Sequence, residues 1–162
     1  MYLIVLTRNG IGEFAAMNYS PTASQGPDVL VARNNPTNQH ILVVEDVHEI
    51  RDGMEKLLKA DGYRVSLARD EHDALDKWRL QAPDLILVSL AGAPTDISKA
   101  ATRIREGIPS GERVPVVIFC GSGIGEGDEV ALGHNVHLTR PDNFNQLRSL
   151  LARLLDQANS EV

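Results

Sequence analysis

The sequence predicts a doubly wound α/β domain on a five-stranded parallel sheet. From residue 40 onward, short runs rich in Val, Ile and Leu alternate with segments whose apolar residues recur at helical spacing. The runs are continuously apolar, which is typical of parallel strands covered on both faces. Because parallel strands need a crossover between them and the intervening segments read as helices, a layered α/β fold follows.

Five strands and four amphipathic helices are expected. The strands are residues 41–45, 64–68, 84–89, 114–119 and 135–139. The apolar helix faces are Ile50, Met54, Leu57 and Leu58; Ala74, Leu75 and Trp78; Ile97, Ala100, Ala101 and Ile104; and Phe144, Leu147, Leu150, Leu151, Leu154 and Leu155. Gly62 and Pro83 are expected to end the first two helices. The glycine-rich stretch 121–127 predicts a flexible loop leading into a shortened further helix.

The chain divides near residue 40. Residues 1–39 are rich in Asn, Ser, Pro, Thr and Gly and lack sustained periodicity, so they are interpreted as a largely irregular extension or linker. The domain is expected to cover residues 40–156, and residues 157–162 are expected to form a tail.

Composition argues against several classes of protein. A net charge of −6 leaves no basic excess for neutralising nucleic-acid phosphates. The single cysteine rules out an intramolecular disulfide and a cysteine-rich zinc site, and it favours a reducing compartment. No apolar run approaches the roughly 20 residues that a membrane-spanning helix needs. We therefore expect a cytoplasmic protein that binds neither nucleic acid nor membrane.

Candidate functional residues follow the ends of the expected strands, where doubly wound sheets bind their ligands. Glu45 and Asp46 follow the first strand, and Ser89 ends the third. Cys120 and Arg140 follow the fourth and fifth. A carboxylate at position 89 would complete a three-acid cluster able to bind a divalent cation, and a serine stands there instead.

Four strand segments together carry a pattern known from one protein family. They are Ile41-Leu42-Val43-Val44-Glu45-Asp46, Pro83-Asp84-Leu85-Ile86-Leu87-Val88, Val114-Pro115-Val116-Val117-Ile118-Phe119 and Leu138-Thr139-Arg140-Pro141. In order and spacing, residues 40–156 resemble the receiver domain of two-component response regulators. The resemblance implies a flavodoxin-like fold with strand order 2-1-3-4-5.

The resemblance also implies a phosphorylation site whose reactive residues are replaced here. In the family the acidic pair holds magnesium, and an aspartate at position 89 accepts phosphate from a histidine kinase. A hydroxyl residue at position 120 and a lysine at position 140 bind the phosphoryl oxygens, and an aromatic at position 137 acts as a switch. This sequence has Ser89, Cys120, Arg140 and His137 at those positions.

Each replacement weakens the chemistry that the family performs. A serine hydroxyl needs a general base, and no residue adjacent in the sequence supplies one. The loss of one carboxylate weakens magnesium binding, which leaves Glu45 and Asp46 as a residual acidic pair with weak affinity at most. Cys120 is a poor hydrogen-bond donor and is expected to be an ordinary buried residue. His137 is expected to be half-buried at the edge of the sheet.

The leading hypothesis is a receiver-like protein that is not phosphorylated, is not an enzyme, needs no cofactor and acts through protein–protein contacts. Its partner would be a histidine kinase or another regulator, and the face formed by residues 121–156 is a candidate homodimer surface. One alternative is a receiver that binds Mg²⁺ and docks on a histidine kinase in a phosphorelay. A second alternative is a flavodoxin-like protein that binds a nucleotide or flavin.

Overall fold

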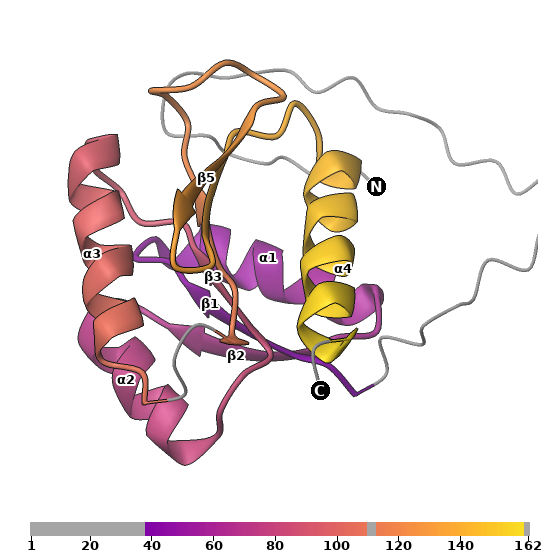
Figure 1. Cartoon of the computed structure of the whole chain (residues 1–162). Coiled ribbons are helices and arrows are strands. Elements are labelled where there is room, and N and C mark those ends of the chain that lie inside the picture. The colour runs from indigo at the N-terminus through magenta and orange to yellow at the C-terminus, as the bar shows by residue number, and fades with distance from the viewer. Residues whose placement is uncertain (1–37, 110–112, 161–162) are drawn as a thin grey trace, which may run out of the picture.

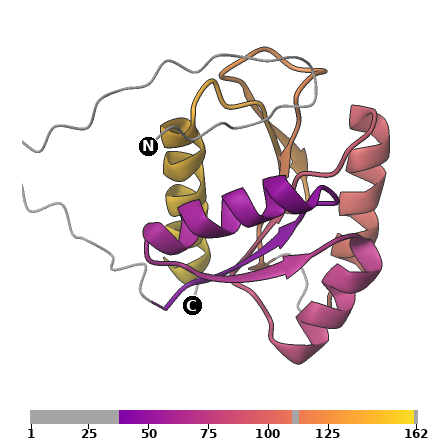
Figure 2. The ribbon, with the colours of Figure 1, turned by 180° about the vertical axis from the view of Figure 1, so that it is seen from behind.

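The computed structural model describes residues 38–109 and 113–160, which form a central sheet covered by helices on both faces (Figure 1). The expected irregular extension at residues 1–39 lies almost entirely outside the described residues. Helices α1 (His48–Ala60) and α4 (Phe144–Ser160) cover one face. Helices α2 (Glu71–Leu80) and α3 (Pro94–Glu106) cover the other, as the view from behind also shows (Figure 2).

Five parallel strands form the body of the sheet in the order β2-β1-β3-β4-β6. Their bounds are His40–Val44 for β1, Arg64–Ala68 for β2, Leu85–Val88 for β3, Val116–Phe119 for β4 and Val136–Thr139 for β6. This order confirms the flavodoxin-like topology expected from the sequence. Strands β1 and β3 are buried along their whole length, as continuous apolar runs predict.

The sheet also contains a strand that the sequence analysis did not predict. Residues 121–133 form no shortened helix: β5 (Glu129–Gly133) pairs antiparallel with β6 at the edge of the sheet. His134 and Asn135, with φ of 52° and 56°, join the two strands as a type I′ turn requires. Glycine-rich residues make a poor helix, and the following Val-Ala-Leu segment instead finds backbone partners on β6.

The helices agree with the predicted apolar faces and begin at recognisable signals. Asp70 caps α2, where its carboxylate accepts a hydrogen bond from the backbone N–H of Asp73 at 2.8 Å. Pro94 opens α3 at the position where its missing N–H has no consequence. Helix α4 continues to Ser160, so four of the residues expected in a tail belong to the helix.

The core lies in two layers, one on each face of the sheet. On one side, leucines of α4 pack with Leu58 of α1 against Ile41, Val43 and Leu87. On the other side, residues of α2 and α3 pack against strand residues that include Leu42, and Trp78 contacts this layer as predicted. In the part of the chain that the structure describes, no helix is long and apolar enough to cross a membrane.

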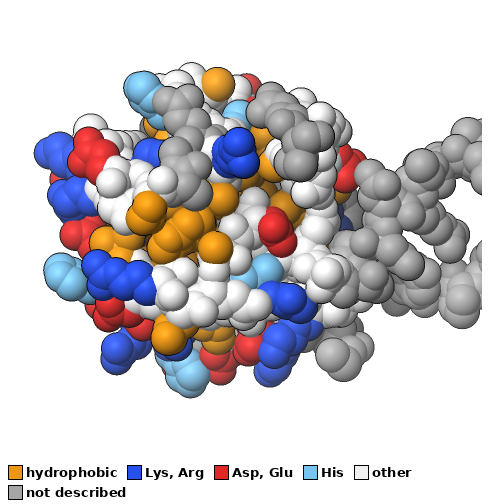
Figure 3. Space-filling view, turned by 60° about the horizontal axis from the view of Figure 1, so that its bottom comes forward, with side chains coloured by type: hydrophobic (Ala, Val, Ile, Leu, Met, Phe, Trp, Pro, Cys, Tyr) orange, Lys and Arg blue, Asp and Glu red, His pale blue; other side chains and the backbone are white. Residues whose placement is uncertain are grey.

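The surface that faces downward in Figure 1 carries a group of hydrophobic side chains with Lys and Arg side chains beside it (Figure 3). Among the described residues, three large hydrophobic side chains are exposed: Leu80, Val130 and Leu132. Leu80 ends α2, whereas Val130 and Leu132 belong to β5. Two of the three therefore lie on the strand that the sequence analysis missed.

Candidate functional site

The carboxyl ends of four parallel strands bring the predicted site residues to one edge of the sheet. Glu45, Ser89, Cys120 and Arg140 each directly follow the last residue of β1, β3, β4 and β6. Backbone hydrogen bonds hold the edge together: the Ser89 N–H donates to the Val44 carbonyl at 2.8 Å. The Cys120 N–H donates to the Thr139 carbonyl at 3.0 Å. We call this group of residues the strand-end site.

Glu45 points inward and is only 2% exposed. Its carboxylate oxygen Oε1 accepts a hydrogen bond from the backbone N–H of Val47 at 2.8 Å. Burial raises the pKa of this carboxyl, and hydrogen bonds from Val47 and from the Ser89 side chain partly oppose the rise. The Ser89 hydroxyl and the Glu45 carboxylate are therefore direct partners.

This contact between Ser89 and Glu45 is a feature that sequence reasoning missed. The two residues are 44 positions apart in the sequence, so no local pattern signals that they meet. A buried carboxylate beside a serine hydroxyl is the arrangement of a general base beside a nucleophile. Here the serine hydroxyl is engaged with a carboxyl whose pKa burial raises above its ordinary value.

Asp46 has a different environment from its neighbour. It is exposed, and its Oδ1 accepts a hydrogen bond from the backbone N–H of Ala91 at 3.0 Å. Asp46 thus ties the end of β1 to the loop between β3 and α3. The two acids also interact with each other, since a side-chain hydrogen bond with Asp46 and the charge of Asp46 both raise the pKa of Glu45.

Cys120 is buried and has little reactivity of the kind a redox or catalytic thiol needs. Its Sγ donates to the Thr139 carbonyl at 3.5 Å. Burial raises the pKa of the thiol, while a hydrogen bond from the backbone of Ser122 and the charge of Arg140 act in the opposite direction. The thiol is held in its neutral form and packs with the core.

Arg140 is hydrogen-bonded to the segment 121–128, which we call the site loop. Its guanidinium Nη1 donates to the Ile124 carbonyl at 3.1 Å, and its backbone carbonyl accepts from the N–H of Gly127 at 2.7 Å. Its own N–H donates to the Asp128 carbonyl at 3.1 Å. The side chain that would contact a phosphoryl group in the family is therefore committed to holding this loop.

The site loop, near the top of Figure 1, is tied down at both ends and against its neighbours. Ile124 packs against the core layer that contains Cys120, and Gln146 of α4 donates to the Gly127 carbonyl at 2.7 Å. A Cβ built on Gly123 would lie 2.9 Å from Cγ of Pro94, at the start of α3. The loop therefore closes directly onto the segment that follows Ser89.

His137 lies in β6 between Val117 of β4 and Ala131 of β5, on the side of α4. Its Nε2 is 3.1 Å from Oδ1 of Asn135, and its Nδ1 is 3.6 Å from the Glu129 carboxylate. Burial lowers the pKa of His137, Glu129 raises it and Arg153 lowers it. Because Glu129 also pairs with Arg153 of α4, His137 belongs to a packed polar cluster under that helix.

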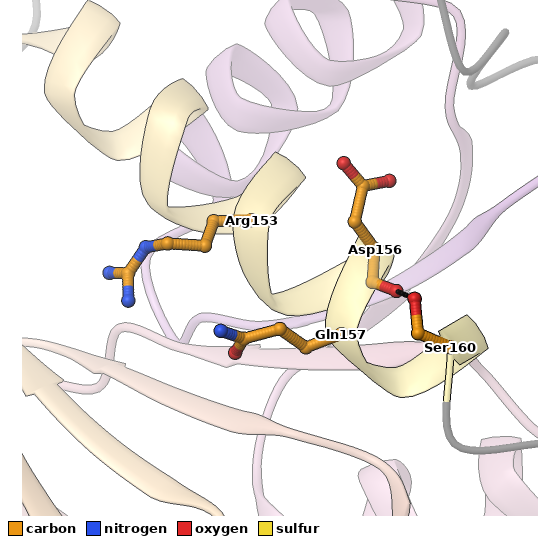
Figure 4. A pocket seen from close by; sticks show the side chains of 4 residues that line it. All are labelled: Arg153, Asp156, Gln157 and Ser160. Carbon is orange, nitrogen blue, oxygen red and sulfur yellow. Dashed lines mark hydrogen bonds between the residues drawn. The ribbon is translucent and has the colours of Figure 1, made fainter. Parts of the chain in front are cut away.

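Among the described residues, one surface depression borders the strand-end site. A depression of about 400 Å³ lies between the starts of α2 and α3 and includes Ala91. The charges there are already paired, since Arg103 contacts Glu71 at 2.8 Å. A depression of about 700 Å³ lies along the far end of α4; Figure 4 shows its residues Arg153, Asp156, Gln157 and Ser160 pointing in different directions.

Glu45 and Asp46 are the two carboxylates that the strand-end site could offer to a magnesium ion. Within residues 38–109 and 113–160, no group of three or more His, Cys, Asp or Glu side chains is placed to hold a metal. The Glu45 carboxyl is engaged by Val47, Ser89 and Asp46. Mg²⁺ is usually held by one or two carboxylates together with several waters, and this site offers two carboxylates with a serine in place of a third acid at position 89.

Comparison with known proteins identifies relatives over the domain. The family model described as the response regulator receiver domain matches residues 41–152. An uncharacterized 14.6 kDa protein of Leptolyngbya boryana is 31% identical over 103 residues, which cover 62% of this chain and 78% of that protein. Response regulator MprA of Mycolicibacterium vanbaalenii is 28% identical over 79 residues, which cover 49% of this chain and only 33% of that regulator.

Solved structures show the same fold. The receiver domain of sensor histidine kinase PA1611 from Pseudomonas aeruginosa, solved with a magnesium ion in its active-site cleft, is 30% identical with a TM-score of 0.57; the match covers 74% of this chain and 98% of that one. A CheY-like receiver domain protein of Methanospirillum hungatei is 17% identical with a TM-score of 0.60, covering 76% and 98%.

Proposed function

Because the chain belongs to the response regulator receiver domain family, we propose that it is a pseudo-receiver: a signalling protein that keeps the fold and is not phosphorylated. The observation that carries this proposal is the pairing of Ser89, at the acceptor position, with the buried carboxyl of Glu45. The protein acts through protein contacts in a two-component or phosphorelay pathway, is not an enzyme, and works in the cytoplasm.

The chemistry of the site supports this proposal. An aspartate is ionised at neutral pH and attacks a phosphoryl group directly, whereas a serine first has to lose a proton. The Ser89 hydroxyl is already engaged with the buried Glu45 carboxyl within the site. The site loop also engages the Arg140 side chain, so one donor of the cation that would contact a transferred phosphoryl group is already used.

The partner class is a histidine kinase or another regulator. The PA1611 relative is the receiver domain of a sensor histidine kinase, which supports a kinase as one such partner. Pseudo-receiver function would then require docking without phosphoryl transfer. Of the two alternatives, the magnesium-dependent phosphorelay receiver retains the acidic pair Glu45 and Asp46 as its support.

A titration followed by ¹⁵N NMR tests the proposal. The protein is titrated with Mg²⁺ and then with beryllofluoride, alongside the PA1611 receiver as a positive control. We expect no saturable shifts for the amides of Asp46, Ser89 and Cys120 at the metal concentrations that saturate the PA1611 receiver. Saturable shifts there would refute the proposal.

A variant at position 89 separates the effect of the missing acceptor from the effect of the other residues of the site. Ser89→Asp restores the nucleophile but leaves Arg140 and the site loop as they are. We expect that acetyl phosphate does not label this variant, as judged by intact mass, while it labels the PA1611 receiver. Stoichiometric labelling of Ser89→Asp would show that Cys120, Arg140 and the site loop do not block the reaction.

A further inference from the structure

The exposed edge of the sheet is formed by β5, a strand with apolar side chains in solvent. All five of its residues are exposed; Val130 is 41% and Leu132 is 47% exposed. On its inner side β5 pairs with β6, and the sheet order places no described strand on its outer side. An outer edge of this kind presents backbone N–H and C=O groups that another strand can bind.

We propose that β5 pairs antiparallel with β5 of a second copy of this chain, so that two sheets join edge to edge. The inference rests on the hairpin itself and not on the proposed function of the strand-end site. It places the interface on a strand that stands where the sequence analysis expected a helix.

The sequence of β5 is complementary to itself in one register. When two copies pair antiparallel about Ala131, Val130 of each lies opposite Leu132 of the other. Val130 is also opposite Leu138 within its own sheet, so its side chain extends the layer that contains Leu138, while Leu132 lies at the register shift of the strand. Cross-strand pairs of aliphatic side chains stabilise such a pairing.

The same register brings no like charges together. Glu129 faces Gly133 of the second copy, and within its own chain Glu129 is already paired with Arg153 at 2.5 Å. Strand β5 has no lysine or proline, two residue types that protect natural edge strands. Features that do protect this edge are the charge of Glu129 and the register shift between Ala131 and Gly133.

The size of the interface sets the expected affinity. Pairing over five residues per strand buries less than the roughly 1,200 Å² of a typical stable interface. We therefore expect a reversible dimer with a dissociation constant of about 10–500 μM, seen only at high protein concentration. Such an affinity suits a contact that forms when signalling assemblies raise the local concentration.

Site-specific crosslinking of the full chain tests the register. The Ala131→Cys variant places two thiols opposite each other across the proposed dyad, whereas Leu80→Cys places a thiol on α2, at a side chain 82% exposed. Cys120 is buried in both variants. Under mild oxidation at about 0.3 mM protein we expect Ala131→Cys to form a covalent dimer at least about tenfold faster than Leu80→Cys. Equal rates would overturn the register.

Analytical ultracentrifugation of Val130→Lys and Leu80→Lys tests the interface without crosslinks. We expect Val130→Lys to raise the dimer dissociation constant at least about tenfold and Leu80→Lys to leave it unchanged. The highest dissociation constant expected for so small an interface is about 500 μM. A wild-type protein that stays monomeric at about 0.5 mM would therefore refute the proposal. Magnesium binding at Glu45 would refute the pseudo-receiver function and leave these measurements unaffected.

Discussion

Replacing Gly123 by alanine tests whether the site loop closes over the strand-end site. Gly123 has a φ of +95°, a backbone conformation that residues other than glycine rarely adopt. A Cβ added at Gly123 would lie 2.9 Å from Cγ of Pro94. Gly121 is the matched control. It lies in the same loop, and a Cβ there would meet nothing within 4 Å.

The structure sets the size of the effect. The unfavourable backbone conformation alone costs an alanine about 1–2 kcal/mol. The contact with the proline ring adds to this cost, because the ring is rigid and attached to the start of α3. A loop held by hydrogen bonds at Ile124 and Gly127 can relieve the strain by opening. In Gly123→Ala we therefore expect the equilibrium constant for opening of the site loop to rise by about 5- to 30-fold.

The single cysteine provides the assay. Cys120 lies at the start of the site loop, is 2% exposed and is the only cysteine of the chain. Its alkylation in the native protein requires local opening, so the labelling rate follows the open population. We expect Gly123→Ala to be labelled about 5–30 times faster than wild type and Gly121→Ala to be labelled at the wild-type rate. Equal rates for the two variants would mean that the loop does not close the site.

Three further outcomes follow from packing and charge. Burial raises the pKa of Glu45 above its ordinary 4.5, so the folded protein keeps a proton that the unfolded chain loses, and the free energy of unfolding falls as pH rises through this range. We therefore expect Glu45→Gln to have a higher free energy of unfolding than wild type in urea between pH 4 and 7. A lower free energy of unfolding would mean that the folded protein needs the Glu45 carboxylate. Leu151→Ala, in the fully buried core, should lose about 3 kcal/mol in the same assay, against little change for the exposed Ser149→Ala. Arg148→Ala removes the 2.6 Å contact with Asp61 and the stacking on Phe144, and should cost about 1 kcal/mol; the control Arg79→Ala, which breaks an exposed pair with Asp76, should cost less.

Much of the fold could be predicted from the sequence because its signals are local. Continuous Val, Ile and Leu runs mark β1 and β3, and the spacing of leucines marks α4. Residues of the strand-end site could also be found, since they directly follow predicted strands. The expected shortened helix within 121–133 was wrong because the segment is stabilised by pairing with β6, a contact that no local propensity records.

The sequence by itself determined the layered α/β architecture and the replacement of the acceptor carboxylate by Ser89. Only the tertiary structure decided what those residues contact. In the folded protein Glu45 contacts Ser89, 44 positions away, and Arg140 donates a hydrogen bond to the site loop. Strand β5 lies at the edge of the sheet. The physical reason is that hydrophobic periodicity indicates which side of a segment is buried. Contacts between residues distant in the sequence depend instead on how strands and loops pack together.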